Sequence, residues 1–172
     1  MKRRALAIRG MALVSVTALG ACGFRPLLVR ADGENVRSQL AAVRIAGPGG
    51  RLGQQLRIAL EDNLDPTSSR PSSLYDLNIR LRNTNRALAI QLDSTTTRYN
   101  LTLSAGFDLV RRVDGELLYT SIVQRVASYN VRRAPFATLT ARQDAERRAA
   151  QEIADDIRTQ LALHFQRRAE DT

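Results

Sequence analysis

The sequence predicts an α+β domain, a two-layer sandwich in which a mainly antiparallel four-stranded sheet carries two helices on one face. Apolar and polar residues alternate over much of residues 75–131, as in strands with one face in water. Two other segments repeat apolar residues every three or four positions, as amphipathic helices do. The order along the chain is strand, helix, three strands, helix.

The first 21 residues have the parts of a bacterial export signal. A basic start contains Lys2, Arg3, Arg4 and Arg9, and an apolar stretch follows at residues 11–19. That stretch is shorter than the roughly 20 residues that a membrane-spanning helix needs. We therefore interpret residues 1–21 as a signal peptide and not as a transmembrane helix.

Cys22 is the only cysteine and follows Leu19, Gly20 and Ala21, as in the lipobox of bacterial lipoproteins. Small residues let a protease reach the backbone, and a thiolate is the nucleophile that can accept a lipid. We expect cleavage before Cys22, a diacylglycerol on its sulfur, and an acyl chain such as palmitate on its amino group. The alternative for a lone cysteine is a buried free thiol.

Cleavage removes 21 of the 172 residues and leaves 151, enough for one domain with a core. We expect a lipid anchor and extended segment at residues 22–40, a single α+β domain at 41–168 and a tail at 169–172. The formal charge is +9, but four cations lie in the leader, so 22 cations face 17 acids in the mature chain. Export argues against a nucleic-acid partner, which a basic protein could otherwise bind.

The first elements of the domain are predicted as follows. Residues 30–40 are polar and mixed, and we predict a loop there. Alternation at residues 41–46 predicts a short strand, which Gly and Pro at residues 47–50 end. Apolar residues at one-face spacing from Leu52 to Leu60 predict a helix that ends at Asp65-Pro66.

Three strands follow, and the first contains a change of phase. Its apolar residues lie at odd positions from Tyr75 to Leu81 but at even positions from Leu88. Either a tight turn separates two strands, or one strand carries a bulge at residues 83–87 that returns Leu88 and Ile90 to the core.

The next strand alternates cleanly over residues 99–109, and Asp114-Gly115 is a strong hairpin turn. The returning strand covers residues 117–131. Its expected packing residues are Ile122, Val123, Val126 and Tyr129.

The last helix is predicted at about residues 140–167. Thr140, with Gln143 three residues later, resembles a capping box at its start. Its apolar stripe is Ala150, Ile153, Ala154, Ile157, Leu161 and Phe165.

The chain contains no pattern typical of catalysis. His164 is the only histidine, so no second histidine or free thiol completes a zinc site, and a structural role is the simpler interpretation. Neither a nucleophile elbow nor a phosphate-binding loop occurs in the sequence. We therefore expect no enzyme and no cofactor.

The lipobox, the segment Cys22-Gly23-Phe24-Arg25-Pro26-Leu27 and the order of elements together resemble the LptE family of lipopolysaccharide-assembly lipoproteins. Leu28 departs from the tyrosine that related chains often have. The resemblance implies a lipid-anchored protein on the periplasmic side of the outer membrane. It implies that the protein plugs and helps assemble the LptD β-barrel and binds lipopolysaccharide. An accessory subunit of another envelope transporter or barrel-assembly machine is the alternative.

The resemblance also implies where lipopolysaccharide would be bound, namely at basic residues near the middle hairpin and before the last helix. The local candidates are Arg132, Arg133, Arg86, Arg98 and Arg142. The adjacent pair Arg132-Arg133 is the preferred choice, and solvated surface arginines are the alternative for each. The outward Arg80, Arg82 and Arg98 would suit the polar lumen of a barrel.

Overall fold

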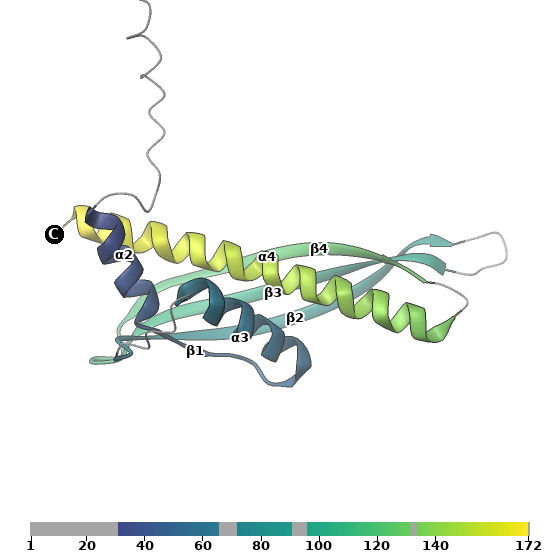
Figure 1. The fold of residues 1–172 in the computed structure, drawn as a ribbon, viewed down its shortest axis with the longest axis horizontal. Coiled ribbons are helices and arrows are strands. Elements are labelled where there is room, and N and C mark those ends of the chain that lie inside the picture. Colours follow the sequence, from purple (N-terminus) through teal and green to yellow (C-terminus); the bar gives the residue numbers. More distant parts are fainter. Residues whose placement is uncertain (1–30, 66–71, 91–95, 132–133, 172) are drawn as a thin grey trace, which may run out of the picture.

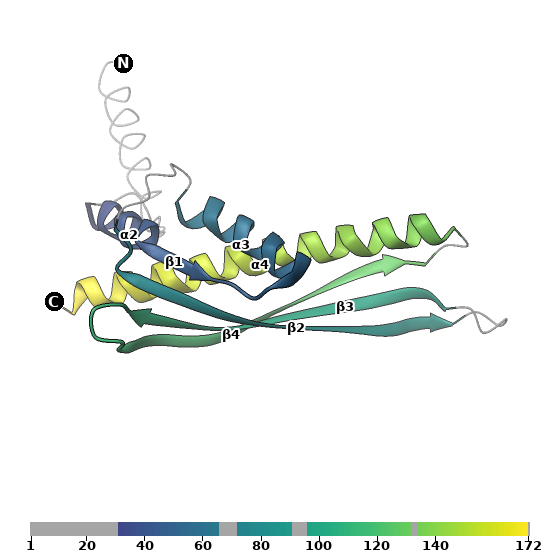
Figure 2. The same ribbon diagram turned by 90° about the horizontal axis from the view of Figure 1, so that it is seen from below.

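The computed structural model describes residues 31–65, 72–90, 96–131 and 134–171 (Figure 1). In chain order the elements are α2 (Ala31–Ala41), β1 (Val43–Ala46), α3 (Gly50–Leu64), β2 (Tyr75–Ile90), β3 (Thr96–Arg111), β4 (Leu117–Asn130) and α4 (Pro135–Glu170). The helices cover one face of a four-stranded sheet, so the α+β two-layer prediction is confirmed (Figure 2).

The strands lie in the order β1-β2-β3-β4. β1 is parallel to β2 because α3 returns the chain to the end of the sheet from which β1 started, whereas the other two pairs are antiparallel. The sheet is therefore mixed, with one short parallel pair at its edge. We call the side of the sheet away from the helices the outer face.

The core lies between the sheet and α4. Odd-numbered residues of β3 from Leu101 to Leu109 are fully buried, and even-numbered ones point to the outer face. The predicted stripe of α4 is buried throughout, and Phe165 packs against Tyr75. Burying a large apolar side chain stabilises a fold by about 1.5–3 kcal/mol, so this layer supplies most of the driving force.

The prediction of a loop at residues 30–40 is wrong, because α2 occupies Ala31–Ala41. Val36 and Leu40, one helical turn apart, are buried against the rest of the core, and α2 packs on α4 and α3. Two apolar residues are too few to give a helical pattern in the sequence. The helix is held by tertiary packing.

β2 is one long strand, which decides between the two alternatives for its phase change. Pairing with β3 is regular as far as Ala87, and the register shifts between Ala87 and Ile90. The irregularity therefore comes after the predicted residues 83–87, and Leu88 is the residue without a partner in β3. The expectation that Leu88 returns to the core is wrong, since 56% of it is exposed.

β4 confirms the predicted hairpin but not all of its packing residues. The turn is at Gly115, whose φ of 73° suits glycine. Val123 is buried, as predicted, whereas Ile122 and Val126 are 73% and 53% exposed on the outer face. Alternation along a strand allows only one of the adjacent residues Ile122 and Val123 to face the core.

α4 begins earlier than predicted. Pro135 occupies its first turn, where a missing N–H costs nothing. Thr140 is not a cap, because its hydroxyl donates to the carbonyl of Phe136 within the helix. The first turns of α4 carry Phe136 and Leu139, both exposed.

Candidate functional site

The predicted site residues divide into two groups. Cys22, Arg132 and Arg133 lie outside the described residues. Arg86, Arg98 and Arg142 are described, and all three lie toward one end of the molecule, where β2 and β4 end and β3 and α4 begin. We call this the distal end; it is opposite α2 and the turn between β3 and β4 (Figure 1).

Arg86 and Arg98 lie on neighbouring strands at the distal end. Arg86 is paired with Asn100, and Arg98 is paired with Ala89 on one side and Asn130 on the other. Both side chains are exposed, and neither forms an ion pair with any residue that the structure describes. No acid of the described ranges neutralises their positive charge.

Arg142 has a different environment from the other two. Its Nε donates to Oε1 of Glu146 at 3.0 Å, one turn further along α4. Glu146 is only 3% exposed and also accepts from Arg51 at the start of α3. Because one carboxylate is shared by two guanidinium groups, Arg142 is mainly part of the contact between α3 and α4.

Apolar and aromatic side chains are also exposed at the distal end. Leu88 lies in β2, and Phe136 and Leu139 lie in the first turns of α4, where Phe136 is 81% exposed. The half-buried rings of Tyr99 and Tyr129 stack with their centroids 5.7 Å apart. Burial raises the pKa of the Tyr129 hydroxyl above its usual value. Sequence reasoning missed Phe136 and Leu139, although their spacing of three residues just after a helix-starting proline was a signal.

A hollow of about 600 Å³ lies on the outer face nearer the middle of the sheet. It is lined by Arg80, Leu81, Arg82, Thr84, Thr102, Ser104, Gly106, Ile122 and Gln124. Arg80 donates to Asp108 at 2.6 Å, and the hydrogen bonds from Arg80 and Thr120 lower the pKa of Asp108. Arg82 has no such partner among the described residues.

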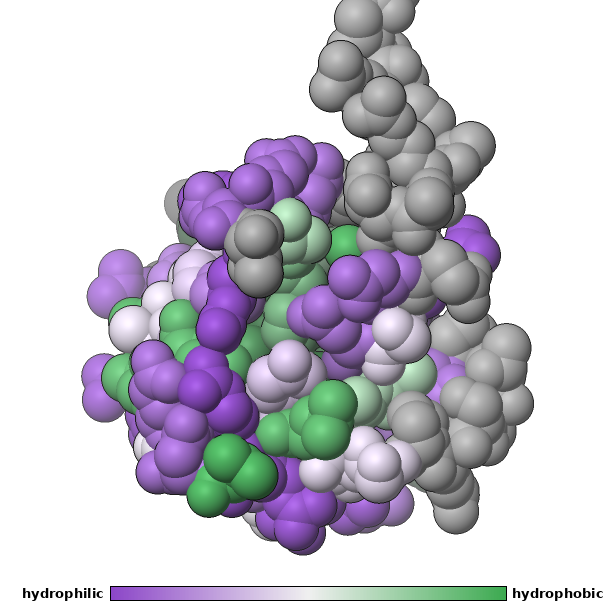
Figure 3. Space-filling model, turned by 90° about the vertical axis from the view of Figure 1, so that its left-hand side faces the viewer, coloured by the Kyte–Doolittle hydropathy of each residue, from purple (hydrophilic) through white to green (hydrophobic). Residues whose placement is uncertain are grey.

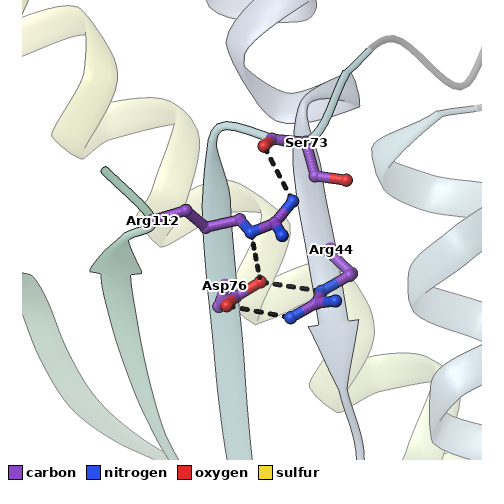
Figure 4. Close-up of polar contacts among 4 residues, drawn as sticks. All are labelled: Arg44, Ser73, Asp76 and Arg112. Carbon is purple, nitrogen blue, oxygen red and sulfur yellow. Dashed lines mark hydrogen bonds and ion pairs between the residues drawn. The ribbon is translucent and has the colours of Figure 1, made fainter. Parts of the chain in front are cut away.

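The end of the molecule opposite the distal end carries a cluster that is structural (Figure 4). Asp76 accepts hydrogen bonds from Arg44 at 2.8 and 3.0 Å, and Nε of Arg112 lies 3.6 Å from the same carboxylate. Arg112 also donates to the carbonyl oxygen of Ser73 at 3.1 Å. The hydrogen bond to Asp76 raises the pKa of Arg44. These contacts tie β1 and the β3–β4 turn to the start of β2.

The surface at that end is mostly hydrophilic, with separate hydrophobic patches (Figure 3). Exposed apolar residues near the β3–β4 turn include Leu74 just before β2, Val113 in the turn and Leu117 at the start of β4. Acids and arginines on the β3–β4 turn pair with one another, since Arg111 contacts both Asp114 and Glu116 at 2.8 Å. Arg111 and Arg112 of this turn are therefore both paired with acids that the structure describes.

No group of three or more histidine, cysteine, aspartate or glutamate residues in the described part of the chain could hold a metal ion. His164 lies between Tyr119 and Phe165, and burial lowers its pKa, so it remains mostly neutral at pH 7. This is the environment of a packed structural histidine. Among the described helices, none combines the length and apolar character needed to cross a membrane.

Comparison with known proteins identifies the same fold elsewhere. The family model LptE, described as lipopolysaccharide-assembly, matches residues 39–161. A candidate lipoprotein from Caulobacter crescentus CB15 is 27% identical with a TM-score of 0.64, covering 75% of this chain and 93% of that one.

Two more distant structures show the fold alone. Rare lipoprotein B from Shewanella oneidensis is 13% identical with a TM-score of 0.53, covering 70% of this chain and 91% of that one. A minor lipoprotein from Acinetobacter baumannii is 17% identical with a TM-score of 0.54, covering 70% and 88% respectively. Among curated proteins, none matches the chain by sequence.

Proposed function

Because the chain belongs to the LptE family of lipopolysaccharide-assembly lipoproteins, we propose that it is an outer-membrane protein anchored through lipid on Cys22. Residues 1–21 are then the export signal, and the folded domain lies on the periplasmic side. Two or more acyl chains hold a protein stably on a bilayer, whereas one is marginal. The lipobox supports the anchor.

The domain binds an LptD-like β-barrel and acts as its plug and assembly partner. A plug inside a barrel must present a stiff and polar surface, because the lumen of a membrane barrel is polar. The long paired strands and the arginines of the outer face suit that role. Nothing in this role requires catalysis, and we propose none.

The protein also binds lipopolysaccharide, at the distal end. The observation that carries this proposal is that Arg86 and Arg98, which pair with no acid in the described part of the chain, lie at the same end as exposed Leu88 and Phe136. Guanidinium groups bind phosphate through paired hydrogen bonds, and exposed apolar side chains gain by covering acyl chains. An anionic lipid offers both kinds of contact.

The test of this function uses the full lipidated protein purified from membranes. Intact mass should show lipid on Cys22 and loss of residues 1–21, and Cys22→Ala should abolish membrane association. LptD should copurify with the wild-type protein, and purified protein should bind lipopolysaccharide.

The arginines at the distal end are tested by the double variant Arg86→Glu/Arg98→Glu. It should weaken lipopolysaccharide binding by about tenfold or more, because like charges brought together at an interface cost several kcal/mol. The control is Arg147→Glu/Arg148→Glu, the same charge change on the exposed side of α4. A wild-type protein that binds neither barrel nor lipid would favour an accessory subunit of another envelope transporter.

A further inference from the structure

The hollow on the outer face exists because Gly106 has no side chain. Gly106 is paired with Arg80 in β2 and with Ile122 in β4, so the gap lies in the middle of a three-strand row. A β-carbon placed at Gly106 would approach only the Cγ1 atom of Ile122, at 3.8 Å. The space in front of Gly106 is therefore open to a side chain from outside.

The two sides of the hollow differ in chemistry. On the β2 side, Arg82 is exposed and without an ionic partner among the described residues. On the β4 side, Ile122 is 73% exposed, and Val126 lies further along the same strand. The floor between them is formed by the small polar residues Thr102 and Ser104.

Charge on the outer face is unbalanced. The described strand residues of this face contain two acids, Asp76 and Asp108, and each already binds an arginine. The arginines without an ion pair there are Arg82, Arg86 and Arg98. The face therefore offers positive charge along β2 and neutral, partly apolar surface along β4.

We propose that this hollow is a protein-docking site that receives a carboxylate side chain at Arg82 and an apolar side chain beside Gly106 and Ile122. The proposal rests on the proposed function and deepens it, because it names the surface that docks on the barrel wall. Arg82 and Ile122 lie two strands apart and are offset by two residues along the strands, so about 12 Å separates their backbones. A docking surface must present its acidic and apolar side chains at that separation.

The chemistry of the hollow favours a protein over the lipid. Threonine, serine and glutamine on its floor and sides would be desolvated by an acyl chain without receiving hydrogen bonds, which costs free energy. Side chains and peptide groups of a protein can supply those bonds. The strands are paired on both sides of Gly106, so the hollow is preformed and needs little ordering on binding.

The experiment compares two variants of the full lipidated chain co-expressed with LptD. Gly106→Asp puts an acid into the hollow, where it would repel an incoming carboxylate and fill the space. Arg82→Glu reverses the charge at the edge without filling the hollow. The controls are Gly49→Asp, at a glycine with nothing within 4 Å, and Arg148→Glu on α4. Circular dichroism checks that each variant is folded.

Both variants should reduce the LptD recovered with the protein at least about tenfold, while lipopolysaccharide binding stays within twofold and the controls match the wild type. Recovery of LptD within twofold of wild type in both variants would overturn the docking site and leave the proposed function standing. Loss of lipopolysaccharide binding with LptD recovery intact would overturn it too, and make the hollow part of the lipid site. If wild-type protein recovers no LptD, the proposed function fails and the docking site with it.

Discussion

The backbone of Pro48 lies against the α-carbon of Gly53, in the first turn of α3. A β-carbon at Gly53 would overlap the carbonyl of Pro48, whose carbon would be only 2.8 Å away. Gly53 is buried, so the segment that connects β1 to α3 passes directly over the helix. This close approach fixes the path of the chain from the end of β1 into α3.

Gly53→Ala should therefore destabilise the protein by about 2–4 kcal/mol, because the backbone of Pro48 must move and cannot move as a flexible side chain would. Chemical denaturation measures the change in the free energy of unfolding. The matched control is Gly49→Ala, where the new methyl group meets nothing within 4 Å and should cost less than about 1 kcal/mol. Equal effects at the two sites would contradict the close approach.

A second prediction concerns α2, which the sequence did not reveal. Leu40→Ala should cost about 2–5 kcal/mol, as truncation of a fully buried leucine does. Arg37→Ala, on the exposed side of the same helix, should change stability by less than about 0.5 kcal/mol. If both variants unfold at the same denaturant concentration as wild type, α2 does not belong to the core.

The contrast between α2 and the other elements explains what the sequence could predict. β3 and the middle of α4 have long, regular apolar patterns, and both were predicted correctly. α2 has only Val36 and Leu40 on its buried side, and its glycine and polar residues are typical of loops. Its helix forms because α4 and α3 provide a surface to pack on, and α4 begins more than 90 residues after α2 ends.

Several ion pairs, like α2, depend on tertiary contacts that the sequence alone does not reveal. The sequence indicates which end is basic, but not which arginines are already bound. The pair of Arg142 and Glu146 is four residues apart and could have been recognised. The pair of Arg80 and Asp108 depends on the register of β2 and β3, and the phase change near Leu88 obscured that register.

A third prediction concerns Glu146, the buried acid between α3 and α4. Glu146→Gln should destabilise the protein by about 1–3 kcal/mol, because it weakens hydrogen bonds from two charged groups. The loss of stability should not exceed this range, because the side chains of Arg51 and Arg142 are each about half exposed (49% and 46%) and water can solvate them. Thermal unfolding followed by circular dichroism measures the effect.

The exposed pair on the same helix provides the control for Glu146. Asp144→Asn breaks the ion pair with Arg147 at the surface and should change stability by less than about 1 kcal/mol. A Glu146→Gln variant as stable as Asp144→Asn would show that the buried contact does not join the two helices.

The last prediction concerns Arg132 and Arg133, which lie outside the described residues. In the sequence they join Val131, just after β4, to Ala134, just before α4, and both of these described neighbours lie at the distal end. Arg132→Glu/Arg133→Glu should weaken lipopolysaccharide binding by about tenfold, because phosphate groups would then meet carboxylates. It should also make binding less sensitive to salt, since the contacts removed are screened ones. Binding measured between about 50 and 300 mM salt gives both results, and Arg147→Glu/Arg148→Glu controls for net charge. Unchanged affinity, with an unchanged salt dependence, would remove Arg132 and Arg133 from the lipid site and leave Arg86 and Arg98 as its cations.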